Sequence, residues 1–173
     1  MHMIFDVKHQ NLQHKARLVV GGYVVGYTDN TIYSSIIKYV PVRLMILIVV
    51  KNGLGLLAGD IGNVSCTDPW AKNILPCCGA EFFLRCGAVV FLNRALYGLK
   101  TAAHLFHIYL GGFIIYLVFT TYRADQDLWI HRSDYYEGYD YIETHVDDII
   151  IADKNPSKYM HAIEMHFKVR DIT

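Results

Sequence analysis

The stretch that most constrains this chain is Tyr139 to Asp153, YDYIETHVDDIIIAD, in which two adjacent aspartates separate two apolar runs. Both runs are rich in β-branched and aromatic residues, which favour strands, and Asp is favoured in tight turns. The pattern therefore predicts a β-hairpin with Asp147 and Asp148 at its turn. Two carboxylates about 4 Å apart repel by about 4 kcal/mol at an effective dielectric near 20, so they need water or a cation between them.

Two interpretations of this acidic pair are open. Adjacent aspartates in a hairpin turn are commonly just solvated, and on Asp147 and Asp148 alone that interpretation is favoured. The other interpretation is a metal site, because hard divalent cations such as Mg²⁺ bind through a few carboxylates and the phosphates of a substrate. The choice between them depends on which other charged residues the chain brings to the pair.

The length of 173 residues fits one domain, or one and a half, and the composition indicates a folded chain, since 53% of the residues are hydrophobic and only 18% are charged. The formal net charge of zero argues mildly against a nucleic-acid binder held by a strong basic field. No CxxC spacing occurs among Cys66, Cys77, Cys78 and Cys86, so no zinc site is predicted. With no signal peptide in Met1 to Gln10, we expect reduced thiols in an intracellular protein.

Two apolar segments resemble membrane spans in length. Val40 to Ala58 is interrupted by Arg43 and Lys51, and Leu105 to Thr121 is interrupted by a Gly-Gly pair. A spanning helix needs about 20 consecutive, mostly apolar residues. We therefore expect both segments to be buried elements and expect no association with a membrane.

The first part of the chain carries two cations on one predicted strand. Met1 to Gln13 is expected to be a frayed lead-in, and His14 to Tyr23 reads as a strand. Lys15 and Arg17 share a parity and would project from the same face. A solvated edge strand explains them, and taken alone that explanation is favoured. The functional alternative is a pair of cations presented to an anion such as a triphosphate.

The middle of the chain predicts a helix followed by a strand that carries an acid. A helix is expected to begin near residues 31–35 and to run to Val50, unless Pro41 opens a second helix in its first turn. Leu54 to Cys66 reads as a strand that delivers Asp60 at or near its end. Like the Asp147-Asp148 pair, Asp60 could be either a solvated acid or a metal ligand.

The rest of the chain alternates helical and strand patterns. Residues 68–88 are irregular, residues 125–132 and 139–152 read as strands, and a closing helix starts at Pro156. A long amphipathic helix is predicted by apolar residues at three- and four-residue steps, which are Leu96, Leu99, Ala103, Phe106 and Leu110. Together these elements predict an α+β fold.

Three features then combine: cations near residue 16, Asp60 after a strand, and the Asp147-Asp148 pair in a hairpin. Two-metal phosphoryl transfer requires carboxylates that bridge metals about 3.5–4 Å apart, with cations to neutralise the phosphates. Carboxylates distant in sequence can meet when neighbouring strands of one sheet carry them. The set therefore favours phosphoryl transfer over solvated turns.

From about Lys15 to its last residue, the chain resembles the reverse transcriptase of copia-type LTR retrotransposons. The matching stretches, in order, are KARLVVGG (Lys15 to Gly22), GDIGN (Gly59 to Asn63), LNRALYGLK (Leu92 to Lys100), DLW (Asp127 to Trp129), HVDDIIIA (His145 to Ala152) and FKVRDIT (Phe167 to Thr173). LYGLK between an early Asp and a VDD is the specific element, because a VDD alone occurs widely.

The resemblance implies the fingers and palm of a right-hand polymerase, with a mixed or antiparallel sheet packed against helices. Residues 1–53 would be fingers-like and residues 54–173 palm-like, while the thumb, ribonuclease H and integrase parts are expected to be absent. The catalytic aspartates fall on Asp60, Asp147 and Asp148. With the carbonyl of Ile61 they would hold two Mg²⁺ ions.

The resemblance also implies the substrates and the surroundings of the reaction. Lys15, Arg17 and Ser65 would line the nucleotide site, and the helix of residues 96–106 would form part of its floor. The partners would be an RNA or DNA template–primer, deoxynucleoside triphosphates and complementing parts of a polyprotein. The expected location is a cytoplasmic virus-like particle or the nucleus.

Two side chains depart from the family pattern. His145 stands where a Tyr is usual before VDD, and Ser65 stands where an aromatic ring normally blocks the ribose 2′-hydroxyl. We therefore expect a truncated RNA-directed DNA polymerase that is weakly active or inactive. The alternatives are a non-catalytic nucleic-acid-binding remnant that keeps the fold, and a small membrane protein whose motif matches are accidental.

Overall fold

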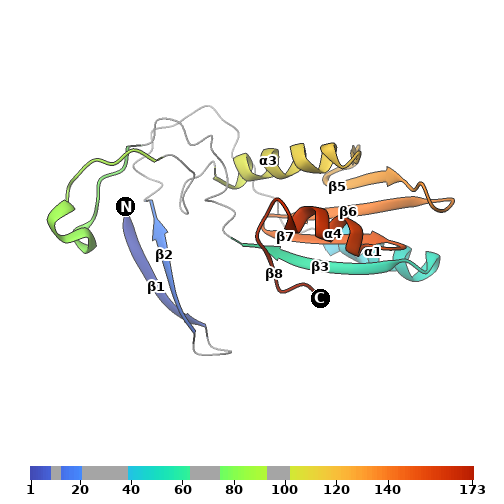
Figure 1. The fold of residues 1–173 in the computed structure, drawn as a ribbon, viewed down its shortest axis with the longest axis horizontal. Coiled ribbons are helices and arrows are strands. Elements are labelled where there is room, and N and C mark those ends of the chain that lie inside the picture. Colours follow the sequence, from blue (N-terminus) through green and yellow to red (C-terminus); the bar gives the residue numbers. More distant parts are fainter. Residues whose placement is uncertain (9–12, 21–38, 63–74, 93–101) are drawn as a thin grey trace. The chain divides into compact units, whose positions relative to one another are not determined.

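The computed structural model describes residues 1–8, 13–20, 39–62, 75–92 and 102–173 (Figure 1). Packing divides the chain into two units, Met1–Tyr33 with Ser65–Phe106, and Ser34–Val64 with His107–Thr173. The predicted boundary after residue 53, between a fingers-like and a palm-like part, stays a prediction.

The first unit contains an antiparallel hairpin of β1 (His2–Lys8) and β2 (Gln13–Val19). The expectation of a frayed lead-in over the first residues was therefore wrong. The residues of β1 pair along their whole length with β2, from His2 opposite Val19 to Lys8 opposite Gln13. A short 3₁₀ helix, η1 (Ala80–Arg85), lies in the stretch predicted to be irregular.

The second unit is built on a six-stranded antiparallel sheet in the order β4-β5-β6-β7-β3-β8. The strands are β3 (Gly55–Ile61), β4 (Thr120–Tyr122), β5 (Asp125–Arg132), β6 (Tyr139–His145), β7 (Asp148–Asp153) and β8 (Val169–Arg170). The predicted strands over 125–132 and 139–152 are confirmed, whereas β4 and β8 were not foreseen. Because β3 pairs with β7, residues far apart in sequence become neighbours.

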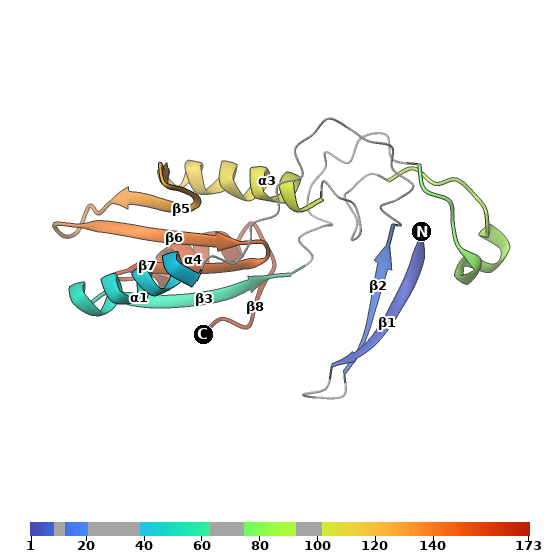
Figure 2. The same cartoon turned by 180° about the vertical axis from the view of Figure 1, so that it is seen from behind.

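In the described part of the chain, three helices flank this sheet: α1 (Tyr39–Asn52), α3 (Ala102–Tyr116) and α4 (Ser157–Glu164). Figures 1 and 2 show α1 and α4 on opposite faces of the sheet. Pro41 lies near the start of the described part of α1, and the residues before Tyr39, which would distinguish a helix beginning near residues 31–35 from one opened by Pro41, lie outside the described residues. The predicted helix over 96–110 is present from Ala102, and its earlier residues lie outside the described part of the chain.

The core lies between the sheet and the helices α3 and α4. It is made of buried apolar side chains, among them Leu110, Ile114, Trp129, Ile142, Ile149, Ile151, Met160 and Ile163. Gly111 lets α3 approach the sheet, because a Cβ on Gly111 would stand 2.9 Å from Cη2 of Trp129. The architecture is a small α+β domain, as predicted.

A buried polar network links α4 to the strands β5, β6 and β7. Asp140 and Asp153 are 0% and 1% exposed, and the ammonium of Lys158 lies 2.9 Å from Asp153 Oδ2 and 3.9 Å from Asp140 Oδ2. The hydroxyl of Tyr159 donates a 2.9 Å hydrogen bond to Asp140. Burial alone would raise the pKa of Asp140, but hydrogen bonds, led by that from Tyr159, lower it.

None of the helices in the described residues is both long enough and apolar enough to cross a membrane.

Candidate active site at the β6–β7 turn

The hairpin turn between β6 and β7 is formed by Val146 and Asp147, because His145 pairs directly with Asp148. The prediction that Asp148 also lies at the turn was wrong, since Asp148 is the first residue of β7. Val146 has a φ of 54°, in the left-handed region, and Asp147 does not. A positive φ at only the first of two loop residues is the pattern of a type II′ turn, which normally takes Gly there. A β-branched residue in this conformation costs about 1–2 kcal/mol, and such strain is concentrated at functional sites.

The second acidic element reaches this turn through β3. Asp60 pairs in register with Asp148, and the N–H of Ile61 donates a 2.7 Å hydrogen bond to the carbonyl of Asp147. Side chains of directly opposed residues project from the same face, with Cβ atoms about 4.5–5.5 Å apart. The register therefore brings the three aspartates of the sequence prediction to one end of the β3–β7 pair.

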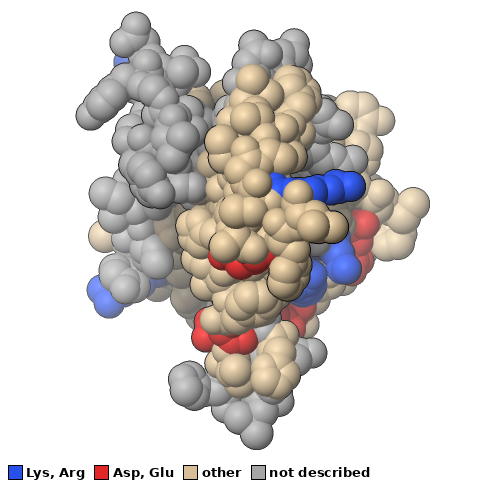
Figure 3. All heavy atoms as spheres, turned by 90° about the vertical axis from the view of Figure 1, so that its left-hand side faces the viewer, with Lys and Arg blue, Asp and Glu red and all other residues tan. Residues whose placement is uncertain are grey.

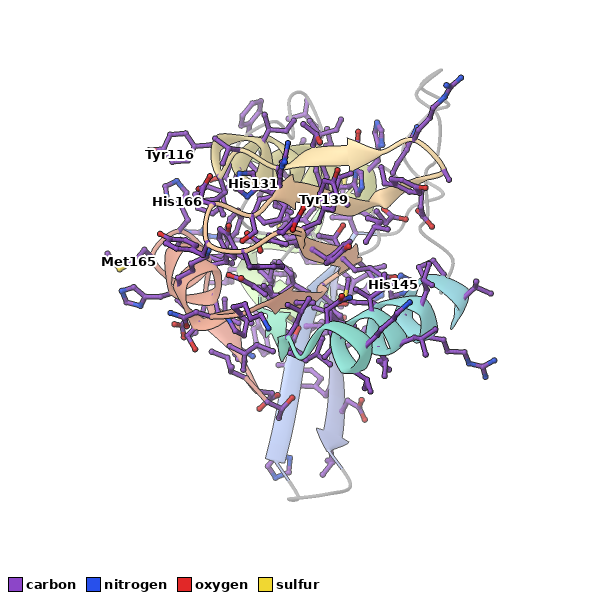
Figure 4. The ribbon with its side chains drawn as sticks, turned by 90° about the vertical axis from the view of Figure 1, so that its right-hand side faces the viewer. Tyr116, His131, Tyr139, His145, Met165 and His166 are labelled. Atoms are coloured by element: carbon purple, nitrogen blue, oxygen red, sulfur yellow. The ribbon has the colours of Figure 1, made fainter. Side chains whose placement is uncertain are left out.

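Four charged or titratable residues lie in one row across the sheet. Arg170 of β8 pairs with Asp60, Asp60 pairs with Asp148, and Asp148 pairs with His145. Figure 4 shows His145 on the side of the sheet that carries α1. The row therefore lies on the face opposite to α4.

The electrostatics of the site show that its carboxylates act on one another. The pKa of Asp148 is raised by burial and then by the negative charges of Asp147 and Asp60, while His145 opposes the shift. Repulsion of this kind falls when a cation enters the cluster. The site is therefore poised to gain from a bound cation.

The donor set fits a hard divalent cation, because it consists of carboxylate oxygens with one imidazole at its edge. Among the residues that the structure describes, no three His, Cys, Asp or Glu side chains stand close enough together to enclose an ion. The chemistry and the register fit a metal, and the carbonyl of Ile61 stays a predicted ligand.

A buried carboxyl group near this row was missed from the sequence. Glu143 shares the face of His145, two residues before it on β6, and is only 7% exposed. Burial, with help from the charges of Asp125 and Asp127, raises the pKa of Glu143 to about 7. Its Oε2 has no hydrogen-bond partner among the described residues. No sequence pattern signals it, because only the strand register places it there.

The predicted nucleotide-binding residues belong to another part of the chain. Lys15 and Arg17 lie on β2 in the first unit, and the guanidinium of Arg17 is 3.9 Å from a carboxylate oxygen of Asp6. Ser65 and the LYGLK motif lie outside the described residues. The roles of Lys15, Arg17 and Ser65 stay predictions.

Comparison with known proteins identifies the family. A family model described as "Reverse transcriptase (RNA-dependent DNA polymerase)" matches residues 1–173. The chain therefore belongs to the reverse transcriptase family. It is also similar to the "Retrovirus-related Pol polyprotein from transposon RE1" of Arabidopsis thaliana, with 24% identity over 168 residues.

That alignment covers 92% of the chain but 11% of the polyprotein, so the chain spans about a tenth of its relative's length. No solved structure matches the chain. The resemblance to copia-type retrotransposon reverse transcriptases is confirmed by the family match and by the transposon relative.

Proposed function

We propose that this chain provides the metal-binding centre of an RNA-directed DNA polymerase that adds deoxynucleotides to a primer. The observation that carries the proposal is the register of β3 and β7, which sets Asp60 opposite Asp148 and beside Asp147. Membership of the reverse transcriptase family supports it. Two Mg²⁺ ions are the proposed cofactors.

Each residue has a distinct task in this proposal. Asp60 and Asp147 hold the metal ions, Asp148 supports them, and the carbonyl of Ile61 completes the donor set. When bound, the metals lower the pKa of the primer hydroxyl and balance charge on the leaving pyrophosphate. No side-chain nucleophile is required.

The substrate side of the proposal rests on the family. The reacting partners are a template–primer and a deoxynucleoside triphosphate, with Lys15 and Arg17 meeting the phosphates and Ser65 lying near the sugar. Further parts of a polyprotein complement the chain. We propose that it acts in a cytoplasmic virus-like particle or in the nucleus, and that synthesis by this segment alone is slow.

A non-catalytic nucleic-acid-binding role is the second candidate. His145 supports it, because this residue replaces the usual Tyr directly beside the metal-binding pair. Figure 3 shows both acidic and basic side chains among the described residues. The net charge of zero agrees with weak, salt-sensitive binding.

A primer-extension assay separates the two candidates. We expect the wild type to extend a primer slowly on a homopolymer template with Mg²⁺, and Asp60→Asn or Asp147→Asn to reduce extension to background, since each removes a metal ligand. Asp134→Asn, an exposed aspartate in the β5–β6 loop, is the matched control and should behave as wild type. Salt-dependent duplex binding without any extension by the wild type would select the non-catalytic role instead.

A further inference from the structure

Arg170 is held in a defined place beside the acidic cluster. It pairs in register with Asp60, so the two side chains project from the same face of the sheet. The backbone on both sides is fixed, because Gly62 N–H donates to the Lys168 carbonyl at 2.7 Å and Ala58 N–H donates to the Thr173 carbonyl at 2.8 Å. The segment that carries Arg170 is therefore hydrogen-bonded to β3 on both sides of this residue.

A β-bulge sets the register that achieves this. Asp60 faces Arg170, yet Ala58 exchanges hydrogen bonds with Thr173, so two residues of the last segment oppose Gly59 alone. The extra residue is accommodated at Asp171, which has a φ of 49°. A left-handed residue at the first position of a bulge is a recognised form of this feature. Bulges of this kind re-aim side chains next to active sites.

Gly62 determines where the guanidinium lies. A Cβ on Gly62 would be 2.8 Å from Nε of Arg170 and 3.1 Å from its Cζ. The guanidinium therefore occupies the space that a side chain at Gly62 would fill. Gly62 directly follows β3, two residues after Asp60, so the guanidinium packs against the end of the strand that carries Asp60.

The guanidinium is also available for a ligand. Among the residues that the structure describes, neither Arg170 nor Asp60 forms an ion pair within 4.0 Å of the other or of a third residue. Arg170 is exposed, so its donors reach solvent. A guanidinium presents a planar fork of donors that matches two oxygens of a phosphate.

We propose that Arg170 binds the phosphates of the incoming deoxynucleoside triphosphate next to the metal ions that Asp60 and Asp147 hold with support from Asp148. A triphosphate with its metal ions would balance the charges of three residues of the row. The metal cations would meet Asp60 and Asp148, and the phosphate anion would meet Arg170. This inference rests on the proposed function. Arg170 would be a third cation for the phosphates, besides the predicted Lys15 and Arg17. Arg170 belongs to the same unit as the metal site, whereas Lys15 and Arg17 belong to the other unit.

Calorimetric titration with deoxythymidine triphosphate and Mg²⁺ tests the inference without depending on turnover. Arg170→Gln should weaken binding about tenfold or more, as expected for loss of a charge-assisted hydrogen bond, and Arg170→Lys should recover part of the loss. Gly62→Ala should also weaken binding, because its Cβ displaces the guanidinium. Arg132→Gln, at the far end of β5, removes the same charge and should bind as wild type.

The outcomes separate this inference from the proposed function. If Asp60→Asn abolishes triphosphate binding while Arg170→Gln binds as wild type, only the role of Arg170 is overturned. If Asp60→Asn binds the triphosphate as tightly as the wild type, the proposed metal site is overturned together with the role of Arg170 beside it. Arg170→Gln should leave the affinity for a primer–template duplex unchanged. If Arg170→Gln lowers the affinity for the duplex but not for the triphosphate, the assignment of Arg170 to the phosphates is overturned.

Discussion

Replacing Lys158 by methionine is expected to lower the free energy of unfolding by about 3–5 kcal/mol. Lys158 is the cation of a network in which Asp153 and Asp140 are almost completely buried. Methionine keeps the length of the side chain but leaves Asp153 without its 2.9 Å ion pair. Breaking a buried pair by removing one partner costs more than the pair contributes, because an uncompensated charge remains.

Urea unfolding followed by far-UV circular dichroism measures this effect. Lys168→Met, an exposed lysine that follows α4, is the control and should change stability by less than about 0.5 kcal/mol. A second variant with Lys158→Met and Asp153→Asn should recover part of the loss, since it removes the unpaired charge. Equal stability of Lys158→Met and the wild type would show that the network does not hold α4 to the sheet.

Replacing Glu143 by glutamine is expected to stabilise the protein at alkaline pH and to have little effect near pH 5. The pKa of Glu143 is raised from 4.5 to about 7, so the folded state holds this proton more tightly than the unfolded state. The wild type is then favoured below pH 4.5 and loses stability as the pH rises through about 7. At about 1.4 kcal/mol per pKa unit, the loss is on the order of 3 kcal/mol, and glutamine avoids it.

Urea unfolding of both proteins at pH 5 and pH 8.5 measures this difference. Asp148, whose pKa is also raised, contributes to the pH dependence of both proteins, so only the difference between them reports on Glu143. Glu137→Gln, an exposed residue of the β5–β6 loop, should give parallel curves. A gain from Glu143→Gln that is the same at both pH values would contradict a buried, protonated carboxyl group.

Much of the second unit follows from local patterns in the sequence. The hairpin around the Asp147-Asp148 pair, the strand ending near Asp60 and the helix that ends near Asn52 all rest on residue preferences within a few positions. The meeting of Asp60 with Asp148 follows from the idea that neighbouring strands carry distant carboxylates. The metal-binding and catalytic roles of these residues stay predictions.

Other features depend on pairings that no local pattern reveals. The strand β8 has only two residues, Val169 and Arg170, and exists because β3 offers it an unpaired edge. The same holds for β1, whose own residues do not predict a strand and which is defined by its pairing with β2. Arg170 and the buried Glu143 were missed for this reason, since a register places them and their own neighbours do not.

The measurement that tests the central claim most directly is a calorimetric titration of the protein with Mg²⁺ at pH 8. We predict that the wild type binds the ion and that the variant with Asp60→Asn and Asp148→Asn does not. We also predict that Mg²⁺ at about one hundred times its dissociation constant stabilises the wild type alone, by about 2.7 kcal/mol. Equal binding by both proteins, or none by the wild type, would contradict a shared metal site on Asp60, Asp147 and Asp148.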